Sequence, residues 1–157
     1  MINALTKTVF GHKLNESFTL ADNLKFLSSK GLLNEGELAE LAISKKSGIA
    51  KCPACTPEID LVNGIQIKHA RSHPRSSGNG QVAYISIKNT KATIFAVVTE
   101  SVTGKQYFLH IPYKARQHLC GNTISIPFDN YGGPGNSQWW LHEVGSFDQL
   151  CELAKNA

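Results

Sequence analysis

The segment ATIFAVVTESVTGKQYFLHI, residues 92–111, decides the fold class because two runs of strand-forming residues flank a single turn. Ala92–Glu100 and Lys105–Ile111 are rich in β-branched and aromatic residues, as strands are. Thr103-Gly104 lies between them, and its glycine can take the left-handed conformation that a tight turn needs. The segment therefore predicts an antiparallel hairpin.

Four further segments between residues 51 and 128 alternate apolar and polar residues, which is the period of a half-buried strand. These segments are Glu58–Leu61, Ile65–His69, Gln81–Lys88 and Thr123–Pro127. Residues 72–80 and 130–138 are rich in Gly, Asn, Ser and Pro and are expected to form loops. Together with the hairpin, these strands predict a central, mostly antiparallel mixed sheet.

Helical periodicity occurs on both sides of the β-rich region. Residues 19–31 and 34–44 predict two N-terminal helices, each opened by a residue that can cap a helix. Ser146 with Gln149 predicts the start of one closing helix, which ends near Lys155. The expected fold class is therefore α+β.

Length and composition indicate one soluble domain. The 157 residues suffice for a core of their own, with a helical part at 19–46, a basic β-rich part at 51–128 and a closing helix at 146–156. Hydrophobic residues make up 41% of the chain and charged residues 18%, which is ordinary for a globular protein. No apolar run approaches the roughly 20 residues of a membrane span, and residues 1–10 lack the pattern of a secretory signal. We therefore expect a cytoplasmic protein.

Positive charge is concentrated in the middle of the chain. Residues 51–119 carry nine Lys and Arg residues and three acids, a net charge of +6, whereas residues 120–157 carry a net charge of −3. Concentrated positive charge attracts polyanions, so nucleic acid, above all DNA, is the expected partner, and an acidic protein is the alternative. Phosphate contacts through cations and base stacking through a tryptophan are predicted for Arg71, Arg75, Lys114, Arg116 and Trp139.

The stretch PEIDLVNGIQIK, residues 57–68, alternates apolar and polar residues on both sides of an Asn-Gly pair. A three-residue loop with Gly64 left-handed would pair Leu61 with Ile65 and bury the apolar side chains of both strands on one face. That register also gathers four polar side chains on the opposite face, namely Glu58, Asp60, Gln66 and Lys68.

These four side chains are of the types that metal-assisted phosphodiester hydrolysis uses. Mg²⁺ takes oxygen ligands and retains several waters, so Asp60 could hold it with help from Gln66 or Glu58. Such an ion could activate water and stabilise charge on a scissile phosphate. Lys68 could orient the water or neutralise the developing charge.

Pro57-Glu58-x-Asp60 followed by Gln66-x-Lys68 resembles the PD-(D/E)XK nuclease superfamily, in its variant with Gln as the middle residue. The resemblance implies a Mg²⁺-dependent endonuclease of restriction or homing type that hydrolyses DNA phosphodiester bonds. It assigns the main metal ligand to Asp60 and the water-polarising role to Lys68, and it leaves room for a further acid, Glu37 or Glu40. A nuclease of this size that cuts both strands would be a symmetric homo-oligomer.

Two cysteines and two histidines have the spacing of a zinc site, Cys-x₂-Cys followed by His-x₃-His: Cys52, Cys55, His69 and His73. Tetrahedral Zn²⁺ accepts two thiolates and two imidazoles, and a close cysteine pair in a reducing compartment is typical of metal or redox sites. The alternative function is therefore a non-catalytic nucleic-acid-binding module in which zinc staples the hairpin.

The remaining histidines and one cysteine leave further alternatives open. His118 or Cys120 could replace a histidine in the zinc site. His110 and His118 could instead act as the general base and general acid of a metal-independent ribonuclease.

Overall fold

The structure is a computed structural model, and the residues that it describes are 8–9, 12–13, 35–53, 56, 58–88 and 90–157. The chain divides into two compact units, Met1–Leu38 and Ala39–Ala157, and each is described by itself. In the first unit, β1 (Thr8–Val9) pairs antiparallel with β2 (His12–Lys13). The helix predicted at residues 19–31 lies outside the described residues.

The fold is α+β with a mixed sheet, as the sequence predicts. The helices are α3 (Glu35–Ser47), α4 (Tyr113–Arg116), the 3₁₀ helix η1 (Gln138–His142) and α5 (Phe147–Lys155). The strands of the second unit are β3 (Ile65–Arg71), β4 (His73–Pro74), β5 (Gln81–Ser86), β6 (Thr93–Thr99), β7 (Gln106–Ile111), β8 (Thr123–Pro127) and β9 (Glu143–Val144). They form a four-stranded sheet of order β3-β6-β7-β9 and a three-stranded sheet of order β4-β5-β8.

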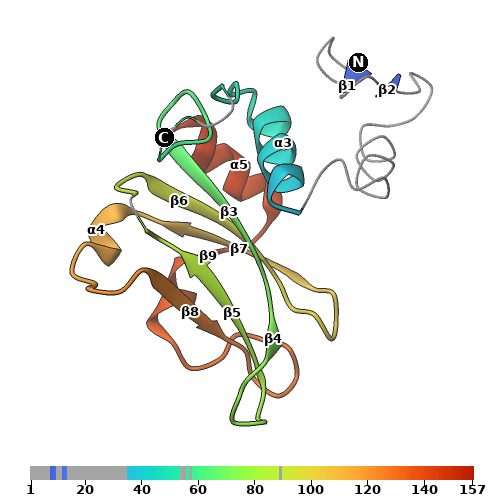
Figure 1. Cartoon of the computed structure of the whole chain (residues 1–157), viewed down its shortest axis with the longest axis vertical. Coiled ribbons are helices and arrows are strands. Elements are labelled where there is room, and N and C mark those ends of the chain that lie inside the picture. Colours follow the sequence, from blue (N-terminus) through green and yellow to red (C-terminus); the bar gives the residue numbers. More distant parts are fainter. Residues whose placement is uncertain (1–7, 10–11, 14–34, 54–55, 57, 89) are drawn as a thin grey trace. The chain divides into compact units, whose positions relative to one another are not determined.

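The second unit has three layers, with the four-stranded sheet in the middle (Figure 1). One face of that sheet packs against α3 and α5, where Ile43 and Leu150 are fully buried with Phe95 of β6. The other face packs against the three-stranded sheet, where Ile85 and Ile126 meet the even-numbered residues of β6. Strand β6 is therefore covered on both faces, which is why its sequence is a continuous apolar run.

The predicted hairpin at residues 92–111 is confirmed as β6 and β7, which pair antiparallel with Phe95 opposite His110. Gly104 has a φ of 74° and turns the chain. The pair β3–β6 is parallel, with Gln66 opposite Ile94 and Lys68 opposite Ala96. A parallel neighbour needs a crossover connection, and here the hairpin of β4 and β5 provides it.

Ser72 is the corner at which the chain leaves one sheet and enters the other, since β3 ends at the preceding residue and β4 begins at the next. Figure 1 shows β3 running directly into β4. The Ser72 N–H donates to the Thr99 carbonyl at 2.9 Å. Its hydroxyl donates to the Gln81 side chain at 3.1 Å and accepts from the Ser101 N–H at 2.8 Å. These bonds fix the direction of β4 relative to β3.

The two other predicted helices are confirmed, one of them with different bounds. Helix α3 extends three residues beyond the predicted end at Ser44, to Ser47. The closing helix α5 begins where predicted, because the Ser146 hydroxyl accepts from the Gln149 N–H at 3.2 Å and caps it. Across the described residues, no helix has both the length and the apolar character to cross a membrane.

The predicted strand Glu58–Leu61 is wrong. Only Leu61 forms a β-bridge, with Lys51, and Glu58 has a φ of 67°, which a strand does not allow. The turn itself agrees with the prediction, because the Leu61 N–H donates to the Ile65 carbonyl at 3.3 Å and Gly64 has a φ of 88°. The strand fails because a side chain, that of Asp60, replaces a backbone carbonyl in the ladder.

Candidate functional site

The Asp60 carboxylate is anchored against the strand that carries Gln66 and Lys68. The Ile67 N–H donates to Asp60 Oδ2 at 2.6 Å, and the Asp60 N–H donates to the Ile65 carbonyl at 2.8 Å. One carboxylate oxygen is thus engaged by the backbone in the middle of the Gln-x-Lys motif. The predicted hairpin also places Asp60 beside this strand. In the structure a side-chain hydrogen bond brings Asp60 there, rather than regular strand pairing.

Gln66 and Lys68 lie on the same face of β3, because residues two apart in a strand project to the same side. Both are half-buried. Their cross-strand partners on β6, Ile94 and Ala96, belong to the core between the two sheets. The two polar side chains therefore border an apolar region on an edge strand, where water is partly excluded and charges are less screened.

Glu58 is not part of this cluster in the way that the sequence predicts. The expected register would place Glu58 opposite Lys68, but residues 58–60 do not pair with β3 as a strand. The Glu58 side chain is exposed, while its carbonyl accepts from the Thr90 hydroxyl at 3.1 Å. The backbone of Glu58 thus contacts the loop before β6, and its role as an assisting Mg²⁺ ligand stays a prediction.

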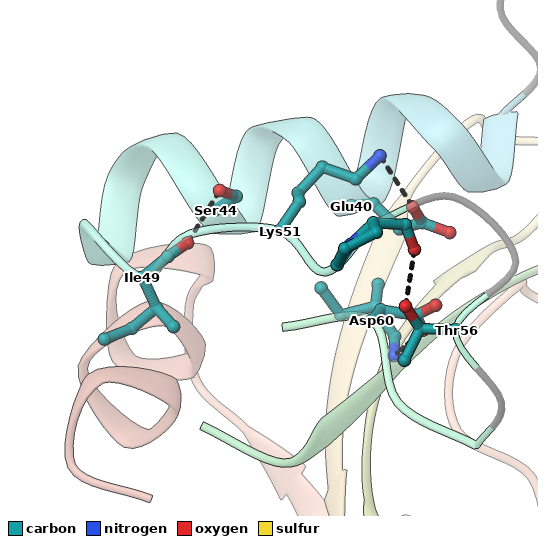
Figure 2. A network of polar contacts seen from close by, with 8 residues as sticks. Glu40, Ser44, Ile49, Lys51, Thr56 and Asp60 are labelled. Atoms are coloured by element: carbon teal, nitrogen blue, oxygen red, sulfur yellow. Dashed lines mark hydrogen bonds and ion pairs between the residues drawn. The ribbon is translucent and has the colours of Figure 1, made fainter. Parts of the chain in front are cut away.

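A second carboxylate near this end of the sheet belongs to Glu40 of α3, one of the two further acids that the family resemblance suggests. Glu40 Oε2 lies 2.8 Å from Lys51 Nζ. Both side chains are mostly shielded from solvent, with exposed fractions of 24% for Glu40 and 30% for Lys51. Figure 2 shows this ion pair in the same close-up as Asp60. The Cys52 N–H donates to the Asp60 carbonyl at 2.8 Å, so the segment that carries Lys51 runs beside Asp60.

No pattern in the sequence marks Lys51 as a site residue. Its contact with Glu40 joins a helix to a segment beyond that helix, and its bridge to Leu61 spans a loop. Neither contact has a local sequence pattern, so the net positive charge of the region is the only sequence feature that relates to Lys51.

The zinc prediction is not supported by the arrangement of its described members. His69 Nε2 lies 3.1 Å from the Thr99 hydroxyl on β6, whereas His73 on β4 contacts the Tyr84 ring at 5.2 Å. Cys52 is half-buried, and Cys55 lies outside the described residues. Among the residues that the structure does describe, no three His, Cys, Asp or Glu side chains form a group that could hold a metal ion.

Arg116 is not available for phosphate contact. Its side chain is 4% exposed, and its guanidinium donates to the Thr90 carbonyl at 2.8 Å and to the Ala92 carbonyl at 2.5 Å. The Tyr113 ring lies 5.0 Å from the guanidinium carbon. Burial lowers the pKa of Arg116, and the interaction with Tyr113 partly opposes this shift. The predicted role is therefore corrected: Arg116 fixes the loop that precedes β6.

The other predicted nucleic-acid contacts are divided between surface and core. Arg71, Arg75 and Lys114 are exposed. Trp139 is 7% exposed and belongs to the core between the sheets, so its ring is not free to stack on a base. The correction follows from its position at the start of η1, where the Ser137 hydroxyl accepts from its N–H and turns the chain inward.

The two histidines of the ribonuclease alternative lie in different surroundings, and His142 is the charged neighbour of His110. His110 is half-buried against the Phe95 ring at 5.0 Å, whereas His118 is exposed. Burial lowers the pKa of His110, and the charge of His142 lowers it further.

No protein-family model and no curated protein matches the chain.

Proposed function

We propose that the protein is a Mg²⁺-dependent endonuclease that hydrolyses DNA phosphodiester bonds, with its centre at Asp60, Gln66 and Lys68. The observation that carries the proposal is the 2.6 Å hydrogen bond from the Ile67 N–H to Asp60 Oδ2. It supports a carboxylate held next to a half-buried amide and a half-buried lysine on one strand.

The donor set fits Mg²⁺, which proteins bind through one or two carboxylates while the ion keeps several waters. The free oxygen of Asp60 and the amide oxygen of Gln66 are the two donors that would hold it. When bound there, the ion would supply positive charge beside the scissile phosphate. Because Mg²⁺ tolerates few protein ligands, the absence of a three-carboxylate group among the described residues is compatible with this assignment.

The side chains of the chain itself have separate tasks. The backbone bond to Ile67 fixes the orientation of the Asp60 carboxylate, which positions its second oxygen without a further loss of side-chain freedom. The Lys68 ammonium carries three donors that can bind a non-bridging phosphate oxygen and orient the attacking water. The partly shielded position of both residues strengthens these electrostatic contacts relative to the same contacts in water.

The Glu40–Lys51 ion pair supports the same centre from the neighbouring segment. Lys51 lies beside the chain that carries Asp60, and its charge is balanced by Glu40 at 2.8 Å. Because Glu40 already neutralises the Lys51 ammonium, Lys51 does not compete with a cation for the Asp60 carboxylate. We therefore assign Glu40 and Lys51 a positioning role, with no direct contact to the phosphate.

The test is cleavage of plasmid, single-stranded DNA and RNA by the purified chain, with Mg²⁺ and with EDTA. Asp60→Asn keeps an oxygen that can accept from Ile67 and removes the charge, so we expect normal folding and a rate lower by about 10²-fold or more. Asp148→Asn is the matched control, because Asp148 is an acid on α5 whose side chain is 76% exposed.

A second pair of variants separates the role of the lysine from a general effect of charge. Lys68→Gln should lower cleavage, whereas Lys105→Gln, which changes an exposed lysine of the β6–β7 turn, should not. Cleavage that survives both Asp60→Asn and Lys68→Gln refutes the mechanism. Binding of DNA without cleavage of any substrate, together with stoichiometric zinc in the purified protein, would favour the zinc-stapled binding module instead.

A further inference from the structure

The three-stranded sheet has an outer face that carries an exposed aromatic ring. In β5 the residues alternate, so Ala83 and Ile85 enter the core while Tyr84 points outward and is 48% exposed. Tyr84 pairs with Ser125 of β8 across the antiparallel ladder. A tyrosine in the middle of a strand normally stabilises the sheet through buried area, and this one keeps half of its surface in water.

Tyr84 lies in a groove with a volume of about 510 Å³. The groove runs over the outer face of β5 and β8 and is bounded by the loop after β4. Hydroxyl and amide side chains form much of its wall, among them Ser76, Ser125 and Asn136, and Trp139 contributes to its lining from the core. This wall offers hydrogen-bond donors and acceptors around one exposed ring.

The ring of Tyr84 is held in place by its neighbour on β4. His73 and Tyr84 have ring centroids 5.2 Å apart and planes tilted by 36°. The ring is therefore supported on one side, while its exposed part faces the groove. A supported ring loses little side-chain entropy when a planar group stacks on it.

Arg75 supplies the charge of the groove. Its backbone is fixed, because its N–H donates to the Gly80 carbonyl at 3.1 Å and its carbonyl accepts from the Gly78 N–H at 2.9 Å. Its side chain is exposed, and the described part of the chain gives the guanidinium no hydrogen bond or ion pair. Among the described residues that line this groove none is acidic, whereas Glu100 and Asp129 line the neighbouring groove of about 380 Å³.

We propose that this groove binds single-stranded nucleic acid, with one base stacked on Tyr84 and an adjacent phosphate bound by Arg75. An aromatic platform next to a cation is the arrangement that single-strand binding uses, because every base has a π-face and every nucleotide has a phosphate. The base faces of a duplex are already stacked on each other, so Tyr84 selects against duplex. The site is distinct from the centre at Asp60 and requires no cleavage.

Binding is measured by fluorescence anisotropy of a labelled dT₁₂ oligonucleotide, in EDTA so that cleavage does not interfere. Tyr84→Ala should weaken binding by about 5-fold or more, and Tyr84→Phe should bind like the unchanged protein because the ring remains. Tyr131→Ala is the matched control, since Tyr131 is 92% exposed and lines the neighbouring groove that contains Glu100 and Asp129. Because binding is measured in EDTA, the result does not depend on cleavage, which separates this site from the proposed nuclease centre.

The charge contribution has its own readout. Arg75→Gln should reduce the slope of log affinity against log salt by about 0.7, the value for one phosphate contact on a single strand. Lys105→Gln, on the β6–β7 turn, should leave the slope unchanged. Duplex of the same length and polyglutamate should compete poorly with dT₁₂.

Three results would each overturn the proposal. The first is an affinity of Tyr84→Ala equal to that of the unchanged protein. The second is an equal loss in Tyr131→Ala, which would show that any exposed tyrosine has the same effect. The third is equal competition by duplex or polyglutamate at matched charge, which would show attraction of anions without recognition of an unpaired base. Arg75→Gln should leave thermal unfolding unchanged because Arg75 is exposed. Tyr84→Phe keeps the ring and its contact with His73, so it controls for the strand stability that Tyr84→Ala loses.

Discussion

Replacement of Arg116 by methionine should destabilise the protein by about 2–4 kcal/mol without removing a nucleic-acid contact. Arg116 is 4% exposed and holds the Thr90 and Ala92 carbonyls at 2.8 and 2.5 Å. Methionine fills part of the volume and donates nothing, so two carbonyls lose their donor. An unsatisfied buried polar group costs about 1–3 kcal/mol, and Thr90 is 5% exposed.

Two terms adjust this sum in opposite directions. Loss of the guanidinium contact with the Tyr113 ring, at 5.0 Å, adds to the destabilisation by about 0.5–1 kcal/mol. Removal of a buried charge lowers the desolvation cost of folding, which is the cause of the lowered pKa of Arg116. Because Ala92 is only half-buried, water can satisfy part of its carbonyl. The net effect stays near the middle of the range.

Urea unfolding measures the change. With a slope of about 2 kcal/mol per molar urea, the midpoint should fall by roughly 1–2 M. Lys114→Met is the control, since Lys114 is exposed, lies two residues away and removes the same charge. That variant should stay within about 0.5 kcal/mol of the unchanged protein. The reasoning is refuted if Arg116→Met unfolds at the original midpoint and instead binds DNA more weakly with a smaller salt dependence.

Two further predictions concern buried groups. Burial alone would raise the pKa of Glu100, but hydrogen bonds from Thr103 and the Val102 N–H outweigh it and hold the pKa below 4.5. The folding stability that results is present above pH 4.5 and is lost as the pH falls through the lowered pKa. Glu100→Gln should therefore be less stable than the unchanged protein at pH 7 and approach its stability in acid. Thermal unfolding at each pH measures the difference. Burial raises the pKa of Cys151 to about 11. A disulfide reagent at pH 8 should therefore label exposed Cys120 in the folded protein, and Cys151 only after unfolding. Rapid labelling of Cys151 in a Cys120→Ser variant would contradict its position in the core.

The parts of the fold that the sequence predicts are those specified by local patterns. Thr123–Pro127 forms β8 with the expected bounds because its alternation is set by one buried and one exposed face. The Ser146 cap and the β6–β7 hairpin are local in the same sense. The parallel pairing of β3 with β6 has no such signal, because it depends on where a hairpin between them docks.

The candidate site divides in the same way. Asp60 is near Gln66 and Lys68 because a short turn joins them, and turn chemistry can be read from residues 61–64. The sequence did not reveal that the Asp60 carboxylate would take a ladder position, since a side chain and a backbone carbonyl compete for the same N–H. Arg116 was misassigned because charge alone does not distinguish a phosphate contact from a buried clamp on a loop.

One continuous stretch of chain connects the two proposed sites. Strand β3 carries Gln66 and Lys68, and the chain turns at Ser72 into β4, which leads to Arg75. The ten residues from β3 to the end of β4 extend at most about 33 Å at roughly 3.3 Å per residue. A stacked strand rises about 3.4 Å per nucleotide, so about ten nucleotides would reach from the groove to Asp60. Shorter oligonucleotides can fill the groove alone, and cleavage should therefore depend on oligonucleotide length more steeply than binding does.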